Sequence, residues 1–395
     1  MLSKINRITF CFLLLVVILQ QETRSQNLSF EKFLSKLVFA TDSSTKSRMI
    51  DEYLMNKSIP ILEGNTAYFI YRGKASIVEM PGEFNEWNPE KTRMVKIPET
   101  NLFLHIEDIP LGGRMEYKFR VDGNWVIDPM NPKKSQGGMG ENSEVWSSTY
   151  TPPRDINVQA GIPHGRLDTI WFESKVLKRT HPIFVYTPPG VNSENRIPTI
   201  YVTDGGEYLS LGLMKNVLDN LIFQKRIRPV MAVFIDPRTN LQDNSTNQRM
   251  TDYAASDTYL DFLQNELATS IEHTYPASRS ANDRLIMGAS MGGLISTYAV
   301  MLRSKFVKNC AAQSPSYQQA ENAIVKLFNQ LIRLDVNVYM DAGTIKDTQT
   351  ACRLISELLR KKGATVNYTE YPEGHNWSNW RARIDDILEY FFPLN

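Results

Sequence analysis

The segment Leu285-Ile286-Met287-Gly288-Ala289-Ser290-Met291-Gly292-Gly293 dictates the architecture of this 395-residue chain. Its apolar first half is typical of a short buried strand, and residues 294–300 continue with the apolar spacing of a helix. A serine between glycines at such a junction sits on a sharp turn, where a Cβ on either side would clash with the neighbouring strand or helix. The segment therefore predicts a strand–turn–helix unit that presents Ser290 as a nucleophile. A glycine-rich turn with a structural serine is the alternative.

Strand and helix patterns alternate on both sides of that turn. Continuous apolar strands between amphipathic helices are typical of a parallel sheet that is covered on both faces. Together with the serine turn, the alternation predicts an α/β-hydrolase fold with a doubly wound sheet over residues 166–395. The expected strands are 183–186, 199–202, 230–235, 284–289, 336–340 and 366–369, and the expected helices lie near 208–224, 257–274, 320–333, 349–362 and 378–392.

A serine nucleophile needs a base and an acid, and this fold supplies them in the chain order serine, acid, histidine. His375 follows a glycine in the loop after the last expected strand. The acid is expected in the loop that follows the preceding strand, residues 341–347. Asp347 is the preferred candidate, because it lies beyond the glycine turn and can reach across to the histidine. Asp341, closer to the strand end, is the alternative.

Backbone amides are the expected stabilisers of an oxyanion in this fold. The first is the N–H of Met291, directly after the serine. The second is expected from the segment after strand 199–203, where Gly205 and Gly206 allow a backbone N–H to point toward the developing charge. Chemistry of this kind requires neither a metal ion nor a cofactor, and we expect none.

Residues 61–148 have another pattern, with short runs of alternating apolar and polar residues separated by turn residues such as Gly112-Gly113 and Asp122-Gly123. Short strands at this spacing predict a small antiparallel β-sandwich. A helical segment over residues 26–60 is expected before it, and a linker over residues 149–165 after it.

Residues 1–25 predict a secretory signal peptide. Two basic residues, Lys4 and Arg7, precede an apolar run of about ten residues, and small residues follow shortly before a cleavage position. The run is shorter than the ~20 residues that cross a bilayer as a helix. We therefore expect a secreted or periplasmic protein without a stable membrane span after signal removal, and an uncleaved N-terminal anchor is the alternative.

The composition excludes some partners. A formal net charge of +1 and the absence of a long basic block argue against nucleic-acid binding. Export would leave two cysteines, Cys310 and Cys352, whose spacing is not that of a metal site. We expect two buried free thiols, with a disulfide as the alternative because sequence does not supply the Cα separation that a bridge requires.

Several motifs are together similar to those of the enterochelin-esterase-like branch of the putative esterase family, which also includes feruloyl and acetylxylan esterases and mycolyltransferases. The resemblance covers residues 165–392 and implies a serine esterase. It also implies two candidate substrate-binding residues, Arg249, which precedes an Asp-Tyr pair, and Trp377. The matching motifs are TIYVTDGG (199–206), LIMGASMGG (285–293), Ser-Pro-Ser (314–316), Ala-Gly-Thr (342–344) and EGHNWSNWR (373–381).

Residues 62–148 resemble the immunoglobulin-like, glycogen-binding-type carbohydrate module that precedes many polysaccharide enzymes. The similar segments are GEFNEW (82–87), Tyr-Lys-Phe (117–119) and DGNWVIDP (122–129). In sugar-binding members two tryptophans, a lysine and an asparagine hold the glycan. The positions here that match them are Trp87, Lys118, Trp125 and Asn142. The same fold often serves only as a packing module, so both roles are open.

The leading hypothesis is an exported serine esterase that acts through an acyl-enzyme on a catecholate-siderophore-type or related small ester. One alternative is a feruloyl or acetyl esterase that acts on plant polysaccharide, so that the substrate would be a glycan-linked ester. Another is a glycan-binding protein with an inert hydrolase domain. An acyltransferase would use the same catalytic residues, and the sequence leaves that distinction open.

Overall fold

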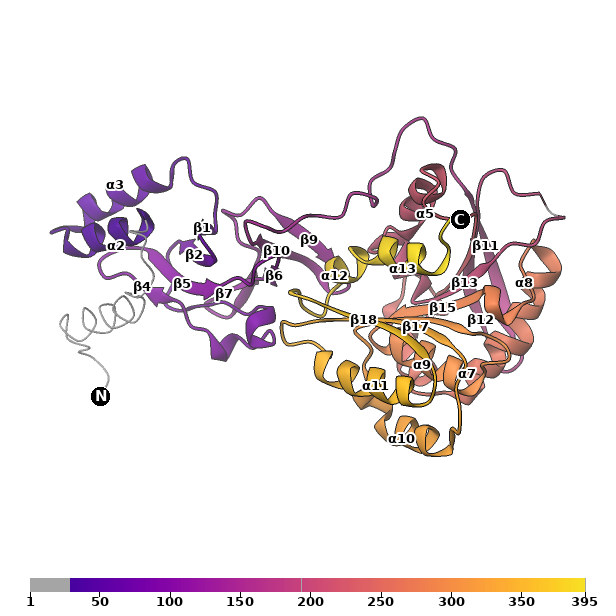
Figure 1. The fold of residues 1–395 in the computed structure, drawn as a ribbon. Helices are drawn as coiled ribbons and strands as arrows, with labels where there is room; N and C mark the ends of the chain where they lie inside the picture. The colour runs from indigo at the N-terminus through magenta and orange to yellow at the C-terminus, as the bar shows by residue number, and fades with distance from the viewer. Residues whose placement is uncertain (1–28, 193, 395) are drawn as a thin grey trace.

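The computed structural model describes residues 29–192 and 194–394. The predicted signal peptide lies outside the described residues. Figure 1 shows two parts: a smaller N-terminal part built from helices and short strands, and a larger part in which helices surround one extended sheet. In the described residues no helix is long and apolar enough to cross a membrane.

Two helices, α2 (Ser29–Phe39) and α3 (Ser43–Leu54), open the described chain. The aromatic face of α2 packs onto the first strands, where Phe30 lies edge-on to Tyr68 with 4.7 Å between ring centroids. Asp42 caps α3 by accepting a hydrogen bond from the backbone N–H of Thr45, as aspartate commonly does at a helix start. The helix pair thus closes one side of the N-terminal part.

The strands that follow form three small antiparallel sheets, as the alternating pattern predicted. Their orders are β1-β2-β5-β4, β3-β7-β8 and β6-β10-β9. The core between them is aromatic, with Phe69, Tyr117 and Phe119 fully buried. The strands are β1 (Ile61–Glu63), β2 (Thr66–Arg72), β3 (Val78–Glu79), β4 (Val95–Lys96), β5 (Leu102–Asp108), β6 (Arg114–Tyr117), β7 (Phe119–Val121), β8 (Asn124–Val126), β9 (Lys134–Gly137) and β10 (Gly140–Trp146).

The larger part contains an eight-stranded sheet in the order β11-β12-β14-β13-β15-β16-β17-β18. From β14 to β18 neighbouring strands are parallel, whereas β11 and β12 form an antiparallel hairpin and β12 also runs antiparallel to β14. The α/β-hydrolase sheet is therefore mixed rather than wholly parallel. Its strands are β11 (Arg166–Ser174), β12 (Arg179–Thr187), β13 (Thr199–Thr203), β14 (Met231–Ile235), β15 (Arg284–Ala289), β16 (Asn309–Gln313), β17 (Asn337–Gly343) and β18 (Thr365–Tyr371).

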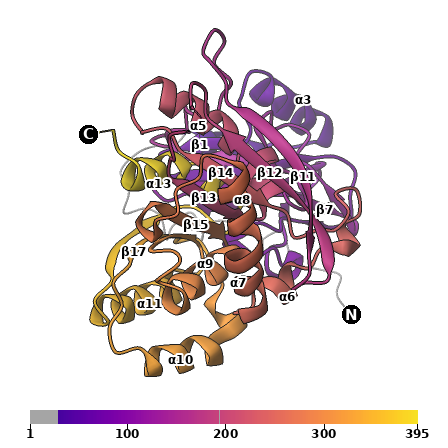
Figure 2. The ribbon, with the colours of Figure 1, turned by 90° about the vertical axis from the view of Figure 1, so that its right-hand side faces the viewer.

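Helices cover both faces of this sheet, which Figure 2 shows from the side of the larger part. The alternate side chains of each central strand enter two separate cores, so Ile286 packs in one and Leu285 and Met287 in the other. The helices are α4 (Gly205–Ser210), α5 (Met214–Phe223), α6 (Arg249–Tyr253), α7 (Asp257–Asp261), α8 (Ala268–Thr274), α9 (Met291–Leu302), α10 (Glu321–Gln330), α11 (Gln349–Lys361), α12 (Trp377–Arg381) and α13 (Ile384–Phe391).

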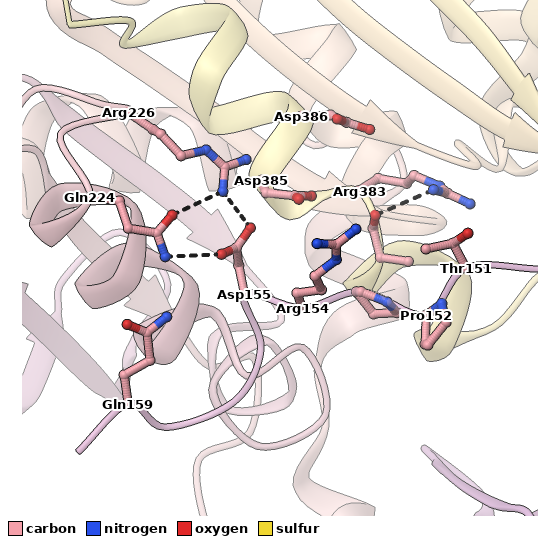
Figure 3. A pocket seen from close by; sticks show the side chains of 12 residues that line it. Thr151, Pro152, Arg154, Asp155, Gln159, Gln224, Arg226, Arg383, Asp385 and Asp386 are labelled. Carbon is pink, nitrogen blue, oxygen red and sulfur yellow. Dashed lines mark hydrogen bonds and ion pairs between the residues drawn. The ribbon is translucent and has the colours of Figure 1, made fainter.

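The segment between the two parts lies against the larger one. Asp155 forms an ion pair with Arg226, with 2.7 Å between Oδ2 and Nη1. A pocket opens there between residues 151–159 and the start of α13, and Figure 3 shows its charged lining. None of Ser290, Asp347 and His375 lines this pocket.

Candidate active site

The chain turns sharply at Ser290, between the end of β15 and the start of α9. The serine has φ 57° and ψ −117°, a conformation that L-residues adopt only where the surroundings impose it. The flanking glycines make this close approach possible, since a Cβ on Gly288 or on Gly292 would collide with the hydroxyl of Thr203 on the neighbouring strand β13. The side chain of Ser290 is nearly buried, with 8% of the residue exposed.

Three predicted residues, about 85 positions apart at the extremes, form one hydrogen-bonded chain. The Nε2 atom of His375 lies 2.9 Å from the hydroxyl oxygen of Ser290. The Nδ1 atom of His375 lies 2.7 Å from Oδ1 of Asp347. The three residues come from the loops after β15, β17 and β18, which end at the same edge of the sheet.

The environment of Asp347 favours its ionised form. Burial alone would raise the pKa of this carboxyl, but the hydrogen bond and the charge of His375 outweigh burial and lower it. The second oxygen, Oδ2, accepts hydrogen bonds of 2.6 Å from the hydroxyl of Ser314 and from the backbone N–H of Gly343. An aspartate fixed in this way can hold a histidine in one orientation and tautomer.

Asp341, the alternative acid, lies elsewhere. It is fully buried, and its Oδ2 atom faces the amide nitrogen of Gln313 at 3.4 Å. Burial raises its pKa to about 7. The structure thus brings Asp347, and not Asp341, to the imidazole of His375.

The segment Ser314-Pro315-Ser316 contributes contacts that sequence reasoning did not assign. The hydroxyl of Ser316 lies 2.9 Å from that of Ser290, and the hydroxyl of Ser314 holds Asp347. The signal that could have identified these residues is their position in the chain. The segment directly follows β16, which pairs with the strand that ends at the serine. Short polar residues at the end of that strand are well placed to reach both the nucleophile and the acid.

The expected oxyanion donors lie at two helix starts. Met291 is the first residue of α9, and Gly205 and Gly206 are the first two residues of α4, so their N–H groups have no partner inside the helix. Asp204, which precedes them, adopts a left-handed conformation with φ 52°. Such unpaired amides at helix N-termini are suited to negative charge.

Arg249, on α6, forms hydrogen bonds with residues near both expected oxyanion donors. Its Nε atom donates to both carboxylate oxygens of Asp204, at 2.9 and 3.0 Å, and its Nη2 atom donates to the carbonyl oxygen of Ala289 at 3.1 Å. Burial raises the pKa of Asp204 to about 6, although the guanidinium opposes that rise. Arg249 therefore joins the start of α4 to the end of β15, directly before Ser290, an arrangement beyond the substrate contact expected for it.

Trp377 begins α12, two residues after the histidine, and only 5% of it is exposed. Its indole N–H donates to Oε2 of Glu207 at 3.1 Å, and its ring lies edge-on to Tyr208 and to Trp380. The residue ties the histidine loop to α4. Its ring is largely covered by protein rather than open for stacking.

The four residues that match glycan positions are placed unevenly. Trp125 on β8 is 51% exposed, while Trp87 and Lys118 are half-buried. The side chain of Asn142 is partly buried, and its amide nitrogen donates to Oε2 of Glu116 at 2.6 Å. The structure therefore leaves Trp125 as the most accessible of the four.

Neither cysteine within the described residues forms a bridge. Cys310 and Cys352 are free and fully buried, and burial raises the pKa of each thiol to about 12. Among the described residues, no group of three or more histidine, cysteine, aspartate or glutamate side chains is arranged to hold a metal ion.

Comparison with known proteins places this chain in a family. The family model described as "Putative esterase" matches residues 174–391, more than half of the chain, and the chain belongs to this family. A second model, the glycogen recognition site of AMP-activated protein kinase, matches residues 65–145. Both matches confirm the two resemblances seen in the motifs.

Individual relatives cover different shares of this chain. The iron(III) enterobactin esterase of Escherichia coli O6:H1 is 23% identical over 279 residues, which are 68% of this chain and 68% of that protein. The structure of ferric enterobactin esterase from Salmonella typhimurium superposes with a TM-score of 0.72 at 16% identity, over 86% of this chain and 98% of that chain. A ferulic acid esterase structure superposes with a TM-score of 0.50 at 20% identity, over 59% of this chain and 98% of that chain.

Proposed function

We propose that this protein is a serine esterase that cleaves carboxylic esters through an acyl-enzyme intermediate. The observation that carries the proposal is the continuous hydrogen-bonded chain from Asp347 through His375 to Ser290, at a strained turn between glycines. Membership of the esterase family adds support. The fold alone would not, because it hosts many activities, whereas this site has the nucleophile, base and acid of a serine esterase.

The reaction follows from these positions. The hydroxyl oxygen of Ser290 attacks the ester carbonyl carbon while Nε2 of His375 accepts the hydroxyl proton. Asp347 keeps Nε2 free to accept, because it holds the imidazole proton on Nδ1 and stabilises the cation. The carbonyl oxygen, now negative, is bound by the N–H of Met291 and by an N–H of the Gly205-Gly206 pair.

Collapse of this intermediate breaks the bond between the carbonyl carbon and the alcohol oxygen. His375 gives its proton to the departing alcohol, and the acyl group stays on Ser290 as an ester. A water molecule then gives a proton to Nε2 and attacks the acyl carbon. The second tetrahedral intermediate releases the carboxylic acid and returns the proton to the serine.

For the substrate, we infer a catecholate-siderophore-type ester. Similarity to proteins named enterobactin esterases extends over 82–86% of this chain and includes the N-terminal part. The ferulic acid esterase covers 59% of the chain. The shared two-part architecture favours the first class of substrate over the second.

The test compares the protein with Ser290→Ala on p-nitrophenyl acetate, methyl ferulate and a ferric catecholate trilactone. The variant should lose turnover by at least about 10⁴-fold on every ester that the parent hydrolyses. Ser316→Ala is the matched control, because this hydroxyl lies 2.9 Å from that of Ser290 but forms no hydrogen bond with His375, and the variant should keep most of the activity. Equal turnover by parent and Ser290→Ala would refute the mechanism, and the preferred ester identifies the substrate class.

A second candidate, a glycan-linked ester substrate, is favoured by the exposed indole of Trp125. Exposed aromatic rings can stack on the apolar faces of sugars, and the module matches a glycogen recognition family. Binding to amylose should weaken in Trp125→Ala. Trp171→Ala is the control, since Trp171 is similarly exposed, at 57%, on β11 of the other part. Equal binding by both variants and the parent would exclude a sugar site at Trp125.

We also propose export through the predicted signal peptide, which rests on the pattern of residues 1–25. Expression of the full chain in a bacterial host should yield periplasmic or secreted protein whose first residue lies near position 26. Mass spectrometry of the purified N-terminus tests this, and an intact N-terminus would indicate an anchor instead.

A further inference from the structure

The N-terminal part of the chain forms buried polar contacts with the loop that carries His375. Glu83, which begins a short 3₁₀ turn after β3, accepts a hydrogen bond on Oε1 from the amide nitrogen of Asn376, the residue next to the histidine. Its other oxygen, Oε2, accepts from the backbone N–H of Glu116 at 2.9 Å. Gly374, on the other side of the histidine, has no room for a Cβ, because the Glu83 carboxyl occupies that space.

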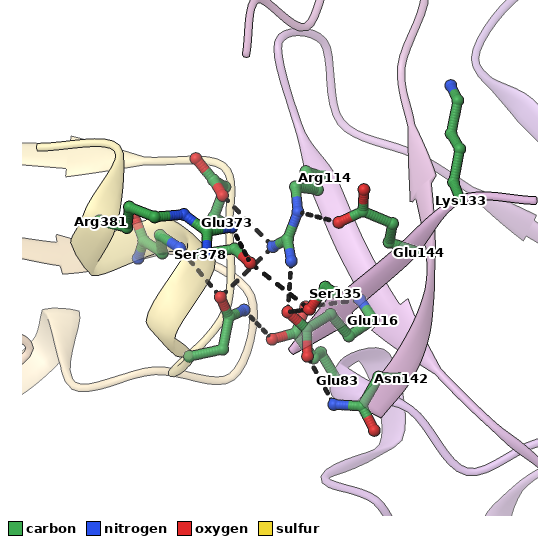
Figure 4. Close-up of polar contacts among 12 residues, drawn as sticks. Glu83, Arg114, Glu116, Lys133, Ser135, Asn142, Glu144, Glu373, Ser378 and Arg381 are labelled. Carbon is green, nitrogen blue, oxygen red and sulfur yellow. Dashed lines mark hydrogen bonds and ion pairs between the residues drawn. The ribbon is translucent and has the colours of Figure 1, made fainter. Parts of the chain in front are cut away.

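A buried arginine makes a second contact with the same loop. Arg114 on β6 is 1% exposed and forms ion pairs with Glu116 and Glu144 inside its own part. Its Nη1 atom also reaches across to Oδ1 of Asn376 at 3.3 Å and to Oε2 of Glu373 at 3.5 Å. Figure 4 shows Arg114, Glu116 and Glu373 close together between the strands of the N-terminal part and the loop before α12.

The loop side of this cluster is equally buried. Glu373 is fully buried and is held from its own part by Arg383, with 2.6 Å between Oε1 and Nη2. The side chain of Asn376 also caps α12, because Oδ1 accepts from the backbone N–H of Asn379 at 2.9 Å. Both polar atoms of the Asn376 amide therefore have partners. The nitrogen donates to Glu83, and the oxygen accepts from Arg114 and from the backbone of α12.

Buried charges are costly unless every lone pair and proton has a partner. In this cluster Oε2 of Glu373 forms no hydrogen bond, but the Glu83 and Asn376 contacts are paired, and moving either residue would leave the other unpaired. A surface contact between two parts would not constrain the loop in this way, because exposed ion pairs contribute little. Here the constraint falls on the residues directly before and after His375.

We propose that Glu83 and Asn376 are positioning residues that hold His375 in register with Ser290, so that the N-terminal part completes the active site whether or not it binds sugar. This inference rests on the serine-esterase mechanism proposed above. Placement errors of about 1 Å at a reacting group can lower a rate by about 10²-fold. Loss of the Glu83–Asn376 contact should therefore lower kcat and leave KM nearly unchanged.

An exchange of donor and acceptor tests the contact. In Glu83→Gln the new amide can accept from the Glu116 N–H, but it then turns its NH₂ toward the NH₂ of Asn376. In Asn376→Asp two carboxyl groups meet, while the cap on α12 is kept. The double variant Glu83→Gln/Asn376→Asp restores one donor facing one acceptor and keeps the net charge of the parent.

We expect the kcat of each single variant to be about 10- to 100-fold below that of the parent, and its KM to stay within about threefold of the parental value. The double variant should recover kcat to within about fivefold of the parent. Tyr117→Phe is the control for stability alone, because it removes a buried 2.6 Å hydrogen bond to Asp128 inside the N-terminal part. It should lower the unfolding midpoint and leave kcat unchanged.

Kinetics are measured well below the lowest unfolding midpoint and normalised to serine sites titrated with a fluorophosphonate. Single variants that retain the parental kcat would overturn the inference. A double variant whose kcat is no higher than that of the less active single variant would overturn it too. If one single variant fails to fold, the other single variant still decides, because a folded single variant with the parental kcat would overturn the inference. Failure of the proposed function is separate: the parent itself would then show no turnover that depends on Ser290.

Discussion

Asp347→Asn should reduce ester turnover far more than its small change in size suggests. Oδ2 of Asp347 accepts from Ser314 and from the Gly343 N–H, so the oxygen of an asparagine would take that place. Its NH₂ would then face Nδ1 of His375, 2.7 Å away, and would donate to it. The imidazole proton would move to Nε2, which could no longer accept the proton of Ser290 at 2.9 Å.

A wrong tautomer of this kind costs about 10⁴-fold in kcat in a related triad, or about 5.5 kcal/mol of activation free energy. The assay is hydrolysis of p-nitrophenyl acetate between pH 6 and 9, with circular dichroism to verify folding. Asp341→Asn is the matched control, because it changes the nearby acid on β17, which does not contact His375, and its kcat should stay within about fivefold of the parent. A folded Asp347→Asn within tenfold of the parent would refute the reasoning, as would an equal loss in Asp341→Asn.

Asp341→Asn should also change the pH dependence of stability: burial raises the pKa of Asp341 to about 7 from 3.8, so the native state keeps a proton that the unfolded chain loses, and parental stability falls as pH rises between those values. The variant lacks this loss, so its advantage in urea unfolding should be larger at pH 8 than at pH 4, by on the order of 2–4 kcal/mol; an equal difference at both pH values would contradict the assignment. Gly206→Ala should lower kcat by about 10²-fold with little effect on KM, because the new Cβ meets a buried aspartate and displaces the amide expected to bind the oxyanion; unchanged kcat would exclude that amide. Arg249→Met should lower the free energy of unfolding by about 3–5 kcal/mol, since it leaves a buried carboxylate without its counter-ion, and a change below about 1 kcal/mol would show that the ion pair is dispensable. Cys310 and Cys352 should react with a thiol reagent only after denaturation, and they should give two thiols per chain once the predicted signal peptide, which contains Cys11, has been removed; reaction in the native state would contradict their burial.

The serine turn and the sheet around it could be predicted because their residues are constrained by local physics. Gly288 and Gly292 are glycines for a steric reason that the sequence shows directly, and the strand before them is apolar on both faces. The hairpin of β11 and β12 could not be predicted as easily. β11 is an edge strand with alternating burial, so its pattern does not show that it runs antiparallel within a parallel sheet.

The contacts of the N-terminal part with the histidine loop could not be predicted from the sequence, for a related reason. In β6 the order Arg114, Met115, Glu116, Tyr117 has the alternation of a strand with one face in solvent. Both charged residues are nevertheless almost completely buried, because the other part of the protein covers that face. Periodicity identifies the faces of a strand, but it does not reveal what lies opposite a polar face.

The N-terminal part thus has two surfaces with separate consequences. The buried charged side chains of β6 and β10 lie near the histidine loop, whereas Trp125 lies on the distinct sheet β3-β7-β8 and is half exposed. A sugar at Trp125 would leave the Glu83–Asn376 contact in place. Trp125→Ala should therefore alter only reactions that involve a polysaccharide, while Glu83→Gln should slow every ester, including the smallest. On these two proposals, a module that matches a glycogen-recognition family would serve the esterase reaction even where the substrate carries no sugar.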